Sequence, residues 1–246
     1  MRIAVLTDLH ANREATEAVL AAVERHAPDR IALLGDLVGY GPDPAYAVET
    51  AERLVSDGAL CLLGNHDEAA VHGPSGMTPH AHDAILWTRR QLSPEHLAFL
   101  STLPLSAELP GMLFVHASAR TPAKWPYVID EKGAGECLAA TDAPLVLCGH
   151  THVPMIYYAL PGREPVRFSP LPHVAAPLSA IRRHVAVVGA VGQPRDGIPA
   201  ACFALLDTER AEISMIRVPY DTQATARKIH EHGLPDWLAL RLQIGR

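Results

Sequence analysis

The sequence lacks any apolar run near the roughly 18 to 20 residues that a membrane-spanning helix needs, so no transmembrane segment is expected. At the N-terminus, MRIAVLTDLH, Asp8 interrupts the apolar stretch before it reaches the length of a signal-peptide core. Cysteine is scarce as well, with four residues and no CxxC pair. Their wide spacing favours buried, reduced thiols in a cytoplasmic protein; they are Cys61, Cys137, Cys148 and Cys202.

Positive charge is also in short supply. The chain has 21 Lys and Arg residues against 27 Asp and Glu residues, a formal net charge of -6 at pH 7. Proteins that bind long nucleic acids usually carry a basic excess, so no nucleic-acid polymer is expected as a partner. A membrane is not expected as a partner either. A small phosphoester substrate remains compatible with the acidic balance, because bound metal cations supply positive charge. The oligomeric state is left open.

Aromatic residues are few, at 5% of the chain, whereas histidine is abundant, with 14 residues. A hydrophobic share of 48% and a charged share of 20% are ordinary for a globular protein. No repeat or low-complexity linker is visible, and the length predicts a single domain over residues 1–246. Imidazole is a common transition-metal ligand and a common acid or base, so the positions of the histidines matter more than their number.

The first 70 or so residues alternate between short β-branched runs and segments with helical spacing. Strands are predicted at 2–8, 30–36 and 59–67, and helices at 12–27 and about 45–56. This β-α-β-α-β order predicts a parallel sheet with right-handed crossovers, and hence an α/β fold.

The remainder of the chain is less regular. Two helices are predicted within residues 80–101, a short helix near 133–140, and a final helix at about 222–240 that packs on its own domain or on a partner. Asp196-Gly197 suggests a hairpin turn between two of the later strands. Strands are predicted near residues 105–109, 112–116, 144–150, 153–160, 164–169, 185–191, 201–206 and 211–218.

Five of the predicted strands end in residues that can bind metal or phosphate. Sites in open α/β sheets form in the crevice beyond the carboxyl ends of the strands, so five such ends in one sheet can converge there. Residues i and i+2 of an extended chain project to the same side, which lets two residues of one motif face one site. The candidates are Asp8 with His10, Asp36, Asn65 with His66 and Asp67, His116, and His150 with His152.

The chemistry of these candidates favours a metal site. Carboxylates, imidazoles and one amide suit borderline metals such as Mn, Fe or Zn, rather than an all-oxygen calcium or magnesium cage or a thiolate site. Gly35, Gly64 and Gly149 precede three of the candidates, and glycine permits unusual backbone angles and close approach of neighbouring segments.

Taken in order, the motifs D-x-H, G-D, G-N-H-D, H and G-H-x-H resemble those of the calcineurin-like metallophosphoesterase superfamily, over about residues 1–206. The stretches GDLVGYGP (35–42) and VGQPRDG (191–197) are similar to a prokaryotic subgroup of small, single-domain predicted phosphodiesterases. They resemble serine/threonine phosphatases and diadenosine tetraphosphatases more loosely. The resemblance implies a four-layer α/β/β/α sandwich with two mixed sheets in a single domain.

The resemblance also implies two divalent transition-metal ions. One metal would be held by Asp8, His10, Asp36 and His152, and the other by Asp36, Asn65, His116 and His150. Asp36 would bridge the two, because a carboxylate has two oxygens. His66 would face the substrate as a catalytic residue, and the adjacent Asp67 could orient its ring.

The mechanism implied by such a centre is hydrolysis. A water bridging the two metals would lose a proton at neutral pH, and the hydroxide would attack phosphorus. His66 would stabilise the developing charge or protonate the leaving oxygen. A phosphodiesterase acting on small substrates is the leading hypothesis. The alternatives are a phosphomonoesterase, of the protein phosphatase or dinucleoside polyphosphate hydrolase type, and a metal-binding interaction module without turnover.

Several residues near these motifs have more than one open interpretation. Tyr40 could contact the substrate or be a packed tyrosine beside the site. The Arg195 guanidinium could bind phosphate or lie in a hairpin turn. His72, His80 and His82 could line the substrate pocket, add a ligand or lie on the surface.

Overall fold

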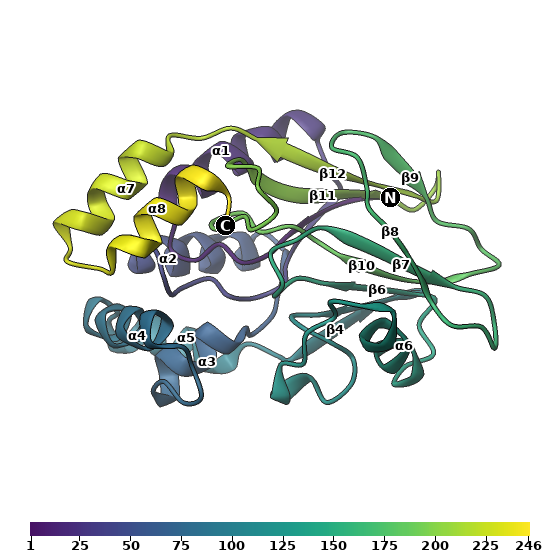
Figure 1. Cartoon of the computed structure of the whole chain (residues 1–246), viewed down its shortest axis with the longest axis horizontal. Coiled ribbons are helices and arrows are strands. Elements are labelled where there is room, and N and C mark those ends of the chain that lie inside the picture. Colours follow the sequence, from purple (N-terminus) through teal and green to yellow (C-terminus); the bar gives the residue numbers. More distant parts are fainter.

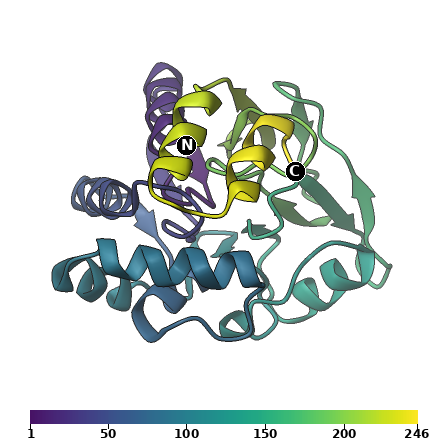
Figure 2. The same ribbon diagram turned by 60° about the vertical axis from the view of Figure 1, so that its left-hand side comes forward.

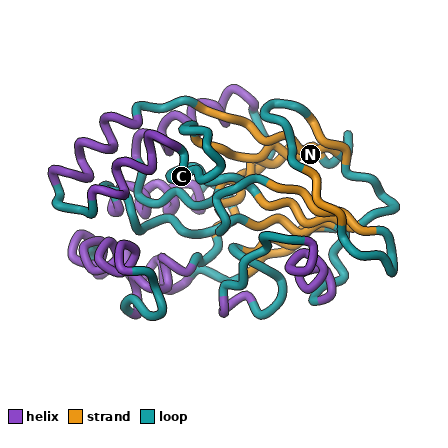
Figure 3. Tube along the Cα trace, in the orientation of Figure 1, coloured by secondary structure: helices purple, strands orange, loops and turns teal.

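The computed structural model describes residues 1–246 as two six-stranded β-sheets stacked face to face, with helices on both outer surfaces (Figure 1 and Figure 3). The first sheet has the strand order β3-β2-β1-β11-β12-β9, and the second has the order β4-β5-β6-β10-β7-β8. Both sheets mix parallel and antiparallel neighbours. This arrangement confirms the predicted four-layer α/β/β/α fold.

Short strands and helices of moderate length build these layers. The strands are β1 (Arg2–Leu6), β2 (Arg30–Leu33), β3 (Leu60–Cys61), β4 (Ser106–Leu109), β5 (Met112–Val115), β6 (Leu145–Cys148), β7 (Met155–Ala159), β8 (Val166–Phe168), β9 (Ala175–Pro177), β10 (Arg183–Val187), β11 (Ala201–Asp207) and β12 (Glu212–Val218). The helices are α1 (Arg13–His26), α2 (Pro44–Ser56), α3 (Asn65–His72), α4 (Pro79–Gln91), α5 (Pro94–Thr102), α6 (Glu131–Ala139), α7 (Thr222–Glu231) and α8 (Asp236–Ile244).

Alternating side chains divide the core of the sandwich into three apolar layers. On β1, Ile3 and Val5 point between the two sheets, whereas Ala4 and Leu6 point toward the helices outside the first sheet. Strands of the second sheet alternate likewise between the shared layer and the layer beneath α6. Burying one large aliphatic side chain contributes roughly 1.5–3 kcal/mol. A slip by one residue would reverse the faces, so the core fixes where each strand ends.

Parallel strands bring their carboxyl ends to one edge of each sheet. β1, β2 and β3 are parallel neighbours, as the alternation of elements predicted. β5, β6 and β10 are parallel neighbours in the second sheet. The prediction that five strand ends converge within one sheet is therefore wrong in one respect. The strand ends belong to two stacked sheets, and the candidate residues come from both.

The third predicted strand is shorter than expected, because a helix begins within its range. β3 covers only Leu60–Cys61, and α3 starts at Asn65. The Asp67 carboxylate accepts the Gly64 backbone N–H at 3.0 Å, which satisfies a free amide at the start of the helix. Asn65, His66 and Asp67 therefore lie in the first turn of a helix instead of at the end of a strand.

Residues 188–200 cross from one sheet to the other and do not form the predicted hairpin. β10 belongs to the second sheet and β11 to the first, so these two strands are not paired. Asp196 forms an ion pair with Arg217 of β12, which anchors the crossing segment to the first sheet. β9 is absent from the sequence prediction, because Ala-Ala-Pro lacks the β-branched and aromatic residues typical of strands.

The C-terminal region forms two helices where one is predicted. Figure 2 shows α7 and α8, in yellow-green and yellow, side by side above α4. Gly233, with φ at 66°, and Pro235 separate them. Lys228 of α7 forms ion pairs with Glu14 at 2.5 Å and with Asp43 at 2.8 Å. Both helices therefore pack on the chain's own helices, and they share an apolar cluster with α4.

Most other predicted elements occur close to their expected positions. The helices α4, α5 and α6 and the strands from β4 to β8 begin and end within a few residues of the predictions. All four cysteines are free and buried, as predicted. No helix combines the length and the apolarity needed to cross a membrane.

Candidate metal centre

Five of the seven predicted metal ligands have a left-handed backbone conformation. Their φ angles lie between 45° and 66°, a region that residues other than glycine rarely occupy. Each such residue costs on the order of 1–3 kcal/mol, so the surrounding structure must hold it in place. The five are Asp8, His10, Asp36, His150 and His152, and they lie just beyond the ends of β1, β2 and β6.

Close contacts between neighbouring loops supply this constraint. The backbone N–H of Asp8 donates to the carbonyl oxygen of Gly35 at 3.0 Å, and that of His10 donates to Asp36 at 3.0 Å. A Cβ atom added at Gly64 would lie 2.8 Å from the Asp36 Cα, so only glycine fits against that loop. The close approach predicted at this glycine is therefore present, and the loops after β1, β2 and β3 hold one another.

Asp8, His10 and His152 form the first cluster of candidate ligands. The Nε2 atoms of His10 and His152 lie 3.1 Å apart. Asp8 Oδ1 lies 3.3 Å from His152 Nε2 and 3.8 Å from His10 Nε2. This oxygen is buried and has no hydrogen-bond partner, whereas Oδ2 accepts from the Thr7 hydroxyl and from the His150 backbone N–H.

Asp36, Asn65, His116 and His150 form the second cluster. His116 Nε2 lies 3.1 Å from His150 Nδ1 and 3.2 Å from Asn65 Oδ1. Asp36 Oδ2 lies 3.4 Å from His116 Nε2, and it also lies 3.6 Å from His10 Nε2 of the first cluster. The structure therefore brings all seven residues together, in the two groups expected, with Asp36 between them.

Three of the imidazole rings are oriented by backbone carbonyl groups. A carbonyl oxygen only accepts hydrogen bonds, so the ring proton must be on Nδ1, and Nε2 is the nitrogen directed to the cluster. The bonds run from Nδ1 of His10 to Val38 at 3.0 Å, from Nδ1 of His116 to Leu34 at 2.9 Å, and from Nδ1 of His152 to Gln193 at 2.6 Å.

These contacts fit a metal ion in each cluster. The two Nε2 atoms of His10 and His152 would present lone pairs to each other across 3.1 Å, an arrangement that a cation between them turns from repulsive to attractive. The unpartnered Asp8 Oδ1 adjoins the same two nitrogens. Imidazole nitrogens with carboxylate and amide oxygens form a donor set suited to transition metals.

Burial determines the charge of most of these imidazoles. It lowers the pKa of His10 and His152 and brings that of His150 to about 3, so these rings are neutral bases at pH 7. His116 is the exception: burial lowers its pKa too, but the charge and hydrogen bond of Asp36, the charge of Asp8 and the Leu34 carbonyl together outweigh burial and raise the pKa to about 9. A metal ion bound there would have to displace this proton, which makes metal binding pH-dependent.

Asp8 and Asp36 remain ionised although both are buried. Burial opposes their charge, but His152 lowers the pKa of Asp8 and His116 lowers that of Asp36 below the usual range. A buried charge requires a partner of opposite sign. Two buried carboxylates thus supply negative charge that divalent cations would balance.

His66 lies beside both clusters and lines the adjoining cavity. Its ring packs against His10 at a centroid distance of 4.9 Å and against Tyr40 at 4.4 Å. Its Nδ1 is buried without a hydrogen-bond partner, and burial lowers the pKa of the ring to about 4. His66 contributes to the walls of the site, at the point where the ligand clusters meet the cavity.

Asp67 bonds to the backbone and not to the His66 ring. Its carboxylate accepts the backbone N–H groups of Gly64 at 3.0 Å and of Val38 at 3.1 Å. Burial and the charge of Asp36 raise the Asp67 pKa to about 7. Asp67 therefore connects the loop after β2 to the start of α3. The sequence suggested that Asp67 could orient the His66 ring, and no hydrogen bond joins the two side chains.

Tyr40 and Arg195 adjoin the first cluster. The Arg195 guanidinium lies 5.6 Å from the centre of the Tyr40 ring, which lies 4.7 Å from the His10 ring. Arg195 Nη2 donates to Gln193 Oε1 at 2.8 Å, and the buried Nε has no partner. Arg195 lies in no ion pair with a carboxylate, so its charge remains available next to the site.

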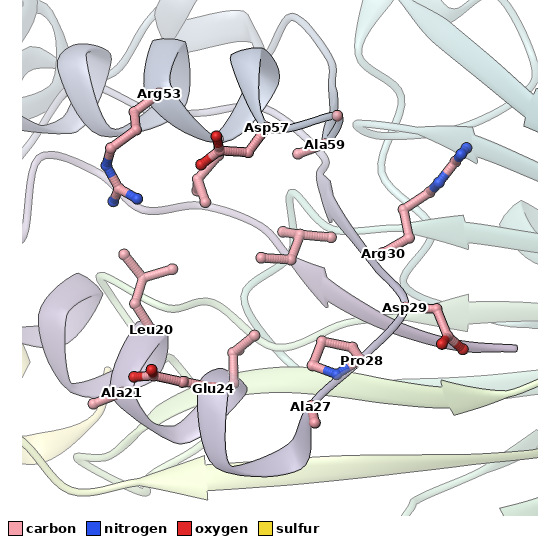
Figure 4. Close-up of a pocket in the computed structure, with 14 residues that line it drawn as sticks. Leu20, Ala21, Glu24, Ala27, Pro28, Asp29, Arg30, Arg53, Asp57 and Ala59 are labelled. Carbon is pink, nitrogen blue, oxygen red and sulfur yellow. The ribbon is translucent and has the colours of Figure 1, made fainter.

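Two cavities of the structure differ in what surrounds them. One, of about 680 Å³, lies between α1 and α2 next to Arg30, which begins β2; Glu24 lines it from α1 and Arg53 from α2 (Figure 4). Its charges have both signs, and it contains no metal-binding cluster. The other, of about 540 Å³, adjoins His66 and His150. The second cavity is therefore the candidate substrate site.

The second cavity includes aromatic residues that the sequence motifs did not identify. Trp125 and Tyr127 line it, and both come from the loop between β5 and α6. The Trp125 indole N–H donates to Glu68 at 2.9 Å, and the Tyr127 ring stacks on His150. Their one signal in the sequence is a Trp-Pro-Tyr stretch in a chain that has few aromatic residues.

The three histidines with open interpretations lie outside the ligand clusters. His72 lines the second cavity and is exposed. His80 and His82 are exposed in the first turns of α4. Of the three, only His72 is therefore in a position to meet a substrate.

Comparisons with known proteins agree with this geometry. Residues 1–154 match the family model for calcineurin-like phosphoesterases. The chain is 34% identical over 251 residues to MJ0912 of Methanocaldococcus jannaschii, described as uncharacterized, with 99% of this chain and 98% of that protein covered. The crystal structure of a metallophosphoesterase from Sphaerobacter thermophilus is 36% identical and has a TM-score of 0.86, with 100% of this chain and 99% of that chain covered.

A more distant solved structure shares the fold. The hypothetical protein PH1004 from Pyrococcus horikoshii OT3 is 19% identical and has a TM-score of 0.79, with 100% of this chain and 98% of that chain covered. The family model spans more than half of the present chain. MJ0912 and the Sphaerobacter thermophilus metallophosphoesterase match this chain along nearly its full length. The chain therefore belongs to the calcineurin-like phosphoesterase family and is a metal-dependent phosphoesterase.

Proposed function

We propose that this phosphoesterase hydrolyses small phosphodiesters at a two-metal centre. The observation that carries the proposal is the position of Asp36, whose Oδ2 lies 3.6 Å from His10 Nε2 and 3.4 Å from His116 Nε2. One carboxylate oxygen within reach of ligand nitrogens from both clusters supports a carboxylate shared by two cations.

The two ligand sets expected from the sequence would each hold one cation, with Asp36 common to both. Mn, Fe and Zn suit this mixture of nitrogen and oxygen donors. When bound, such a pair supplies Lewis-acid activation of the phosphoester and of the attacking water. The remaining steps fall to side chains that surround the clusters.

His66 is proposed to act on the leaving group. Its Nδ1 is buried beside Gly39, where an added Cβ would contact the ring, so Nε2 is left to face the cavity. With its pKa lowered to about 4, the ring is neutral at pH 7, and from that position it would donate a hydrogen bond to the leaving oxygen as negative charge develops there. Asp67 would support this step indirectly, by holding the first turn of α3.

Arg195 is proposed to bind a non-bridging oxygen of the phosphate, and Tyr40 to support it. The free Nε of Arg195 and the absence of a carboxylate partner support this role, because a guanidinium binds phosphate by charge-assisted hydrogen bonds. The Tyr40 ring lies between Arg195 and the imidazole of His10. Tyr40 would thus hold the guanidinium beside the first cluster.

The substrate is proposed to be small and, by preference, a diester. A cavity of about 540 Å³ is within the range of sites that enclose small molecules. The net charge of -6 argues against a long nucleic acid. The preference for diesters rests on the similarity of residues 35–42 and 191–197 to predicted phosphodiesterases.

Two chromogenic substrates separate diesterase from monoesterase activity. The protein is stripped with a chelator and then loaded with Mn²⁺, Co²⁺, Ni²⁺, Zn²⁺ or Mg²⁺. We expect faster turnover of bis-p-nitrophenyl phosphate than of p-nitrophenyl phosphate, and strict dependence on added metal. The reverse preference would assign a monoesterase. No turnover with any metal would favour an interaction module.

His66→Ala is expected to retain both metal ions and lose most turnover. Loss of the proposed hydrogen bond is expected to lower kcat by about 10²- to 10³-fold. Metal content is measured by mass spectrometry and kcat in the diester assay, with His80→Ala as a control because His80 is an exposed histidine outside the site. An unchanged kcat in metal-loaded His66→Ala would rule out the catalytic role.

Arg195→Met is expected to lower kcat/KM for the diester by about tenfold or more, since a hydrogen bond to a charged group contributes about 1.5–3 kcal/mol. Arg195→Lys should restore only part of the loss, because an ammonium lacks the planar fork of a guanidinium. Arg90→Met serves as the control, since Arg90 is exposed on α4. Equal kinetics for wild type and Arg195→Met would contradict a phosphate contact.

A further inference from the structure

We propose that Tyr127 binds a planar aromatic group of the substrate, an aryl ring or a nucleobase carried by the scissile phosphate, by stacking. This inference rests on the proposed function and names the chemical class of the substrate. It concerns the aromatic wall of the second cavity, formed by Trp125 and Tyr127.

The Tyr127 ring is placed to stack on one more partner. One of its faces lies on the His150 imidazole, with ring centroids 4.0 Å apart and an angle of 22° between the planes. Even so, 54% of the residue is exposed, and it lines the same cavity as His66. A tyrosine with one face packed and the rest open to a cavity presents an apolar surface for a second flat ring.

The position of His150 determines how far the open face of Tyr127 lies from the candidate metal ligands. His150 belongs to the second ligand cluster, through Nδ1 at 3.1 Å from His116 Nε2. A ring stacked on Tyr127 is therefore separated from a candidate ligand by the thickness of one phenol ring. An aromatic group joined to the phosphate by a short linkage can occupy that place while the phosphate lies at the cluster.

The cavity has room for such a group. Its volume of about 540 Å³ is within the range of pockets that enclose small organic ligands, and it exceeds the need of a phosphate alone. Trp125 extends the aromatic wall, with its indole N–H bonded to Glu68 and its ring 5.6 Å from that of His116. Both aromatic side chains are thus fixed by contacts with the site itself.

Backbone strain in the loop supports a binding role. Trp125 has φ 53° and ψ 43°, a left-handed conformation that is rare for a bulky residue, and Pro126 follows it. Thr121, which is β-branched, has φ 47° in the same loop. Each such residue costs on the order of 1–3 kcal/mol, and strain of this kind is concentrated at ligand-binding segments. The strained backbone presents Trp125 and Tyr127 to the cavity.

A purely structural role for Tyr127 makes a different prediction. His150 Nε2 has no hydrogen-bond partner, so the stacked phenol could serve only to hold the imidazole for metal binding. Loss of Tyr127 would then weaken metal binding and leave the choice between substrates unchanged. The two roles are therefore separable by measuring both quantities on the same variants.

Phenylphosphonate and cyclohexylphosphonate test the proposal, because they share the phosphonate group and nearly the same size but differ in aromaticity. Their affinities for the Mn²⁺-loaded protein are measured by calorimetry for wild type, Tyr127→Phe and Tyr127→Leu. We expect wild type and Tyr127→Phe to bind the phenyl compound about two- to twelve-fold more tightly. The ratio should fall to near one in Tyr127→Leu, while Mn²⁺ affinity stays the same. Tyr46→Leu, on α2, is the matched control and should keep the wild-type ratio.

Three results would overturn the proposal. Equal affinities of the wild-type protein for the two phosphonates would by themselves exclude selectivity for an aromatic group. A ratio retained in Tyr127→Leu would assign the selectivity to other residues. Weaker Mn²⁺ binding in Tyr127→Leu with an unchanged ratio would make Tyr127 a positioning residue for His150. Because calorimetry requires no turnover, these outcomes are distinct from failure of the proposed hydrolysis, which the chromogenic assay detects.

Discussion

The carboxylate of Asp36 is the group on which the rest of the site depends, because it lies between two sets of imidazoles. Its Oδ2 adjoins His10 on one side and His116 on the other, and its Oδ1 accepts the His66 backbone N–H at 2.8 Å. These histidines follow β1, begin α3 and follow β5, so they come from both sheets. One buried carboxylate thus connects the two ligand clusters with the proposed catalytic histidine, and it also raises the pKa of His116.

The fold holds this carboxylate by packing strained loops against one another. Asp36 itself has φ 53°, and the Gly64 backbone lies so close that no side chain fits between them. The backbone of Val38 connects two of these residues, since its carbonyl accepts a hydrogen bond from the His10 ring and its N–H donates to the Asp67 carboxylate. Candidate ligands held in this way would need little rearrangement to accept a cation, which is the advantage of building a site on a rigid core.

Local sequence patterns predicted which residues form the site better than they predicted which sheet each strand joins. The motif residues lie together as expected, but not in the extended conformation that the spacing argument assumed, because Asp8 and His10 have φ angles of 54° and 45° beyond the end of β1. Their division into two ligand sets came from the family resemblance and not from spacing. Which sheet each strand joins depends on pairing with distant strands, such as β10 with β6 and β7, and no local pattern encodes it. At the start of α3, inside a stretch that otherwise favours a strand, the carboxylates of Asp67 and Asp36 accept backbone N–H groups, and the second of these bonds comes from a distant loop. Trp125 and Tyr127 meet the ligand clusters only through an irregular loop with positive φ angles, which periodicity cannot predict.

The number of metal ions bound by each chain tests the central claim most directly. Metal-free protein is titrated with Mn²⁺ by calorimetry, and the ions retained after gel filtration are counted by mass spectrometry. A carboxylate shared by two clusters predicts two ions for each wild-type chain, and loss of affinity at both sites in Asp36→Asn, because the amide keeps the shape but removes the charge. A single ion in wild type, or two ions bound with unchanged affinity by Asp36→Asn, would contradict it.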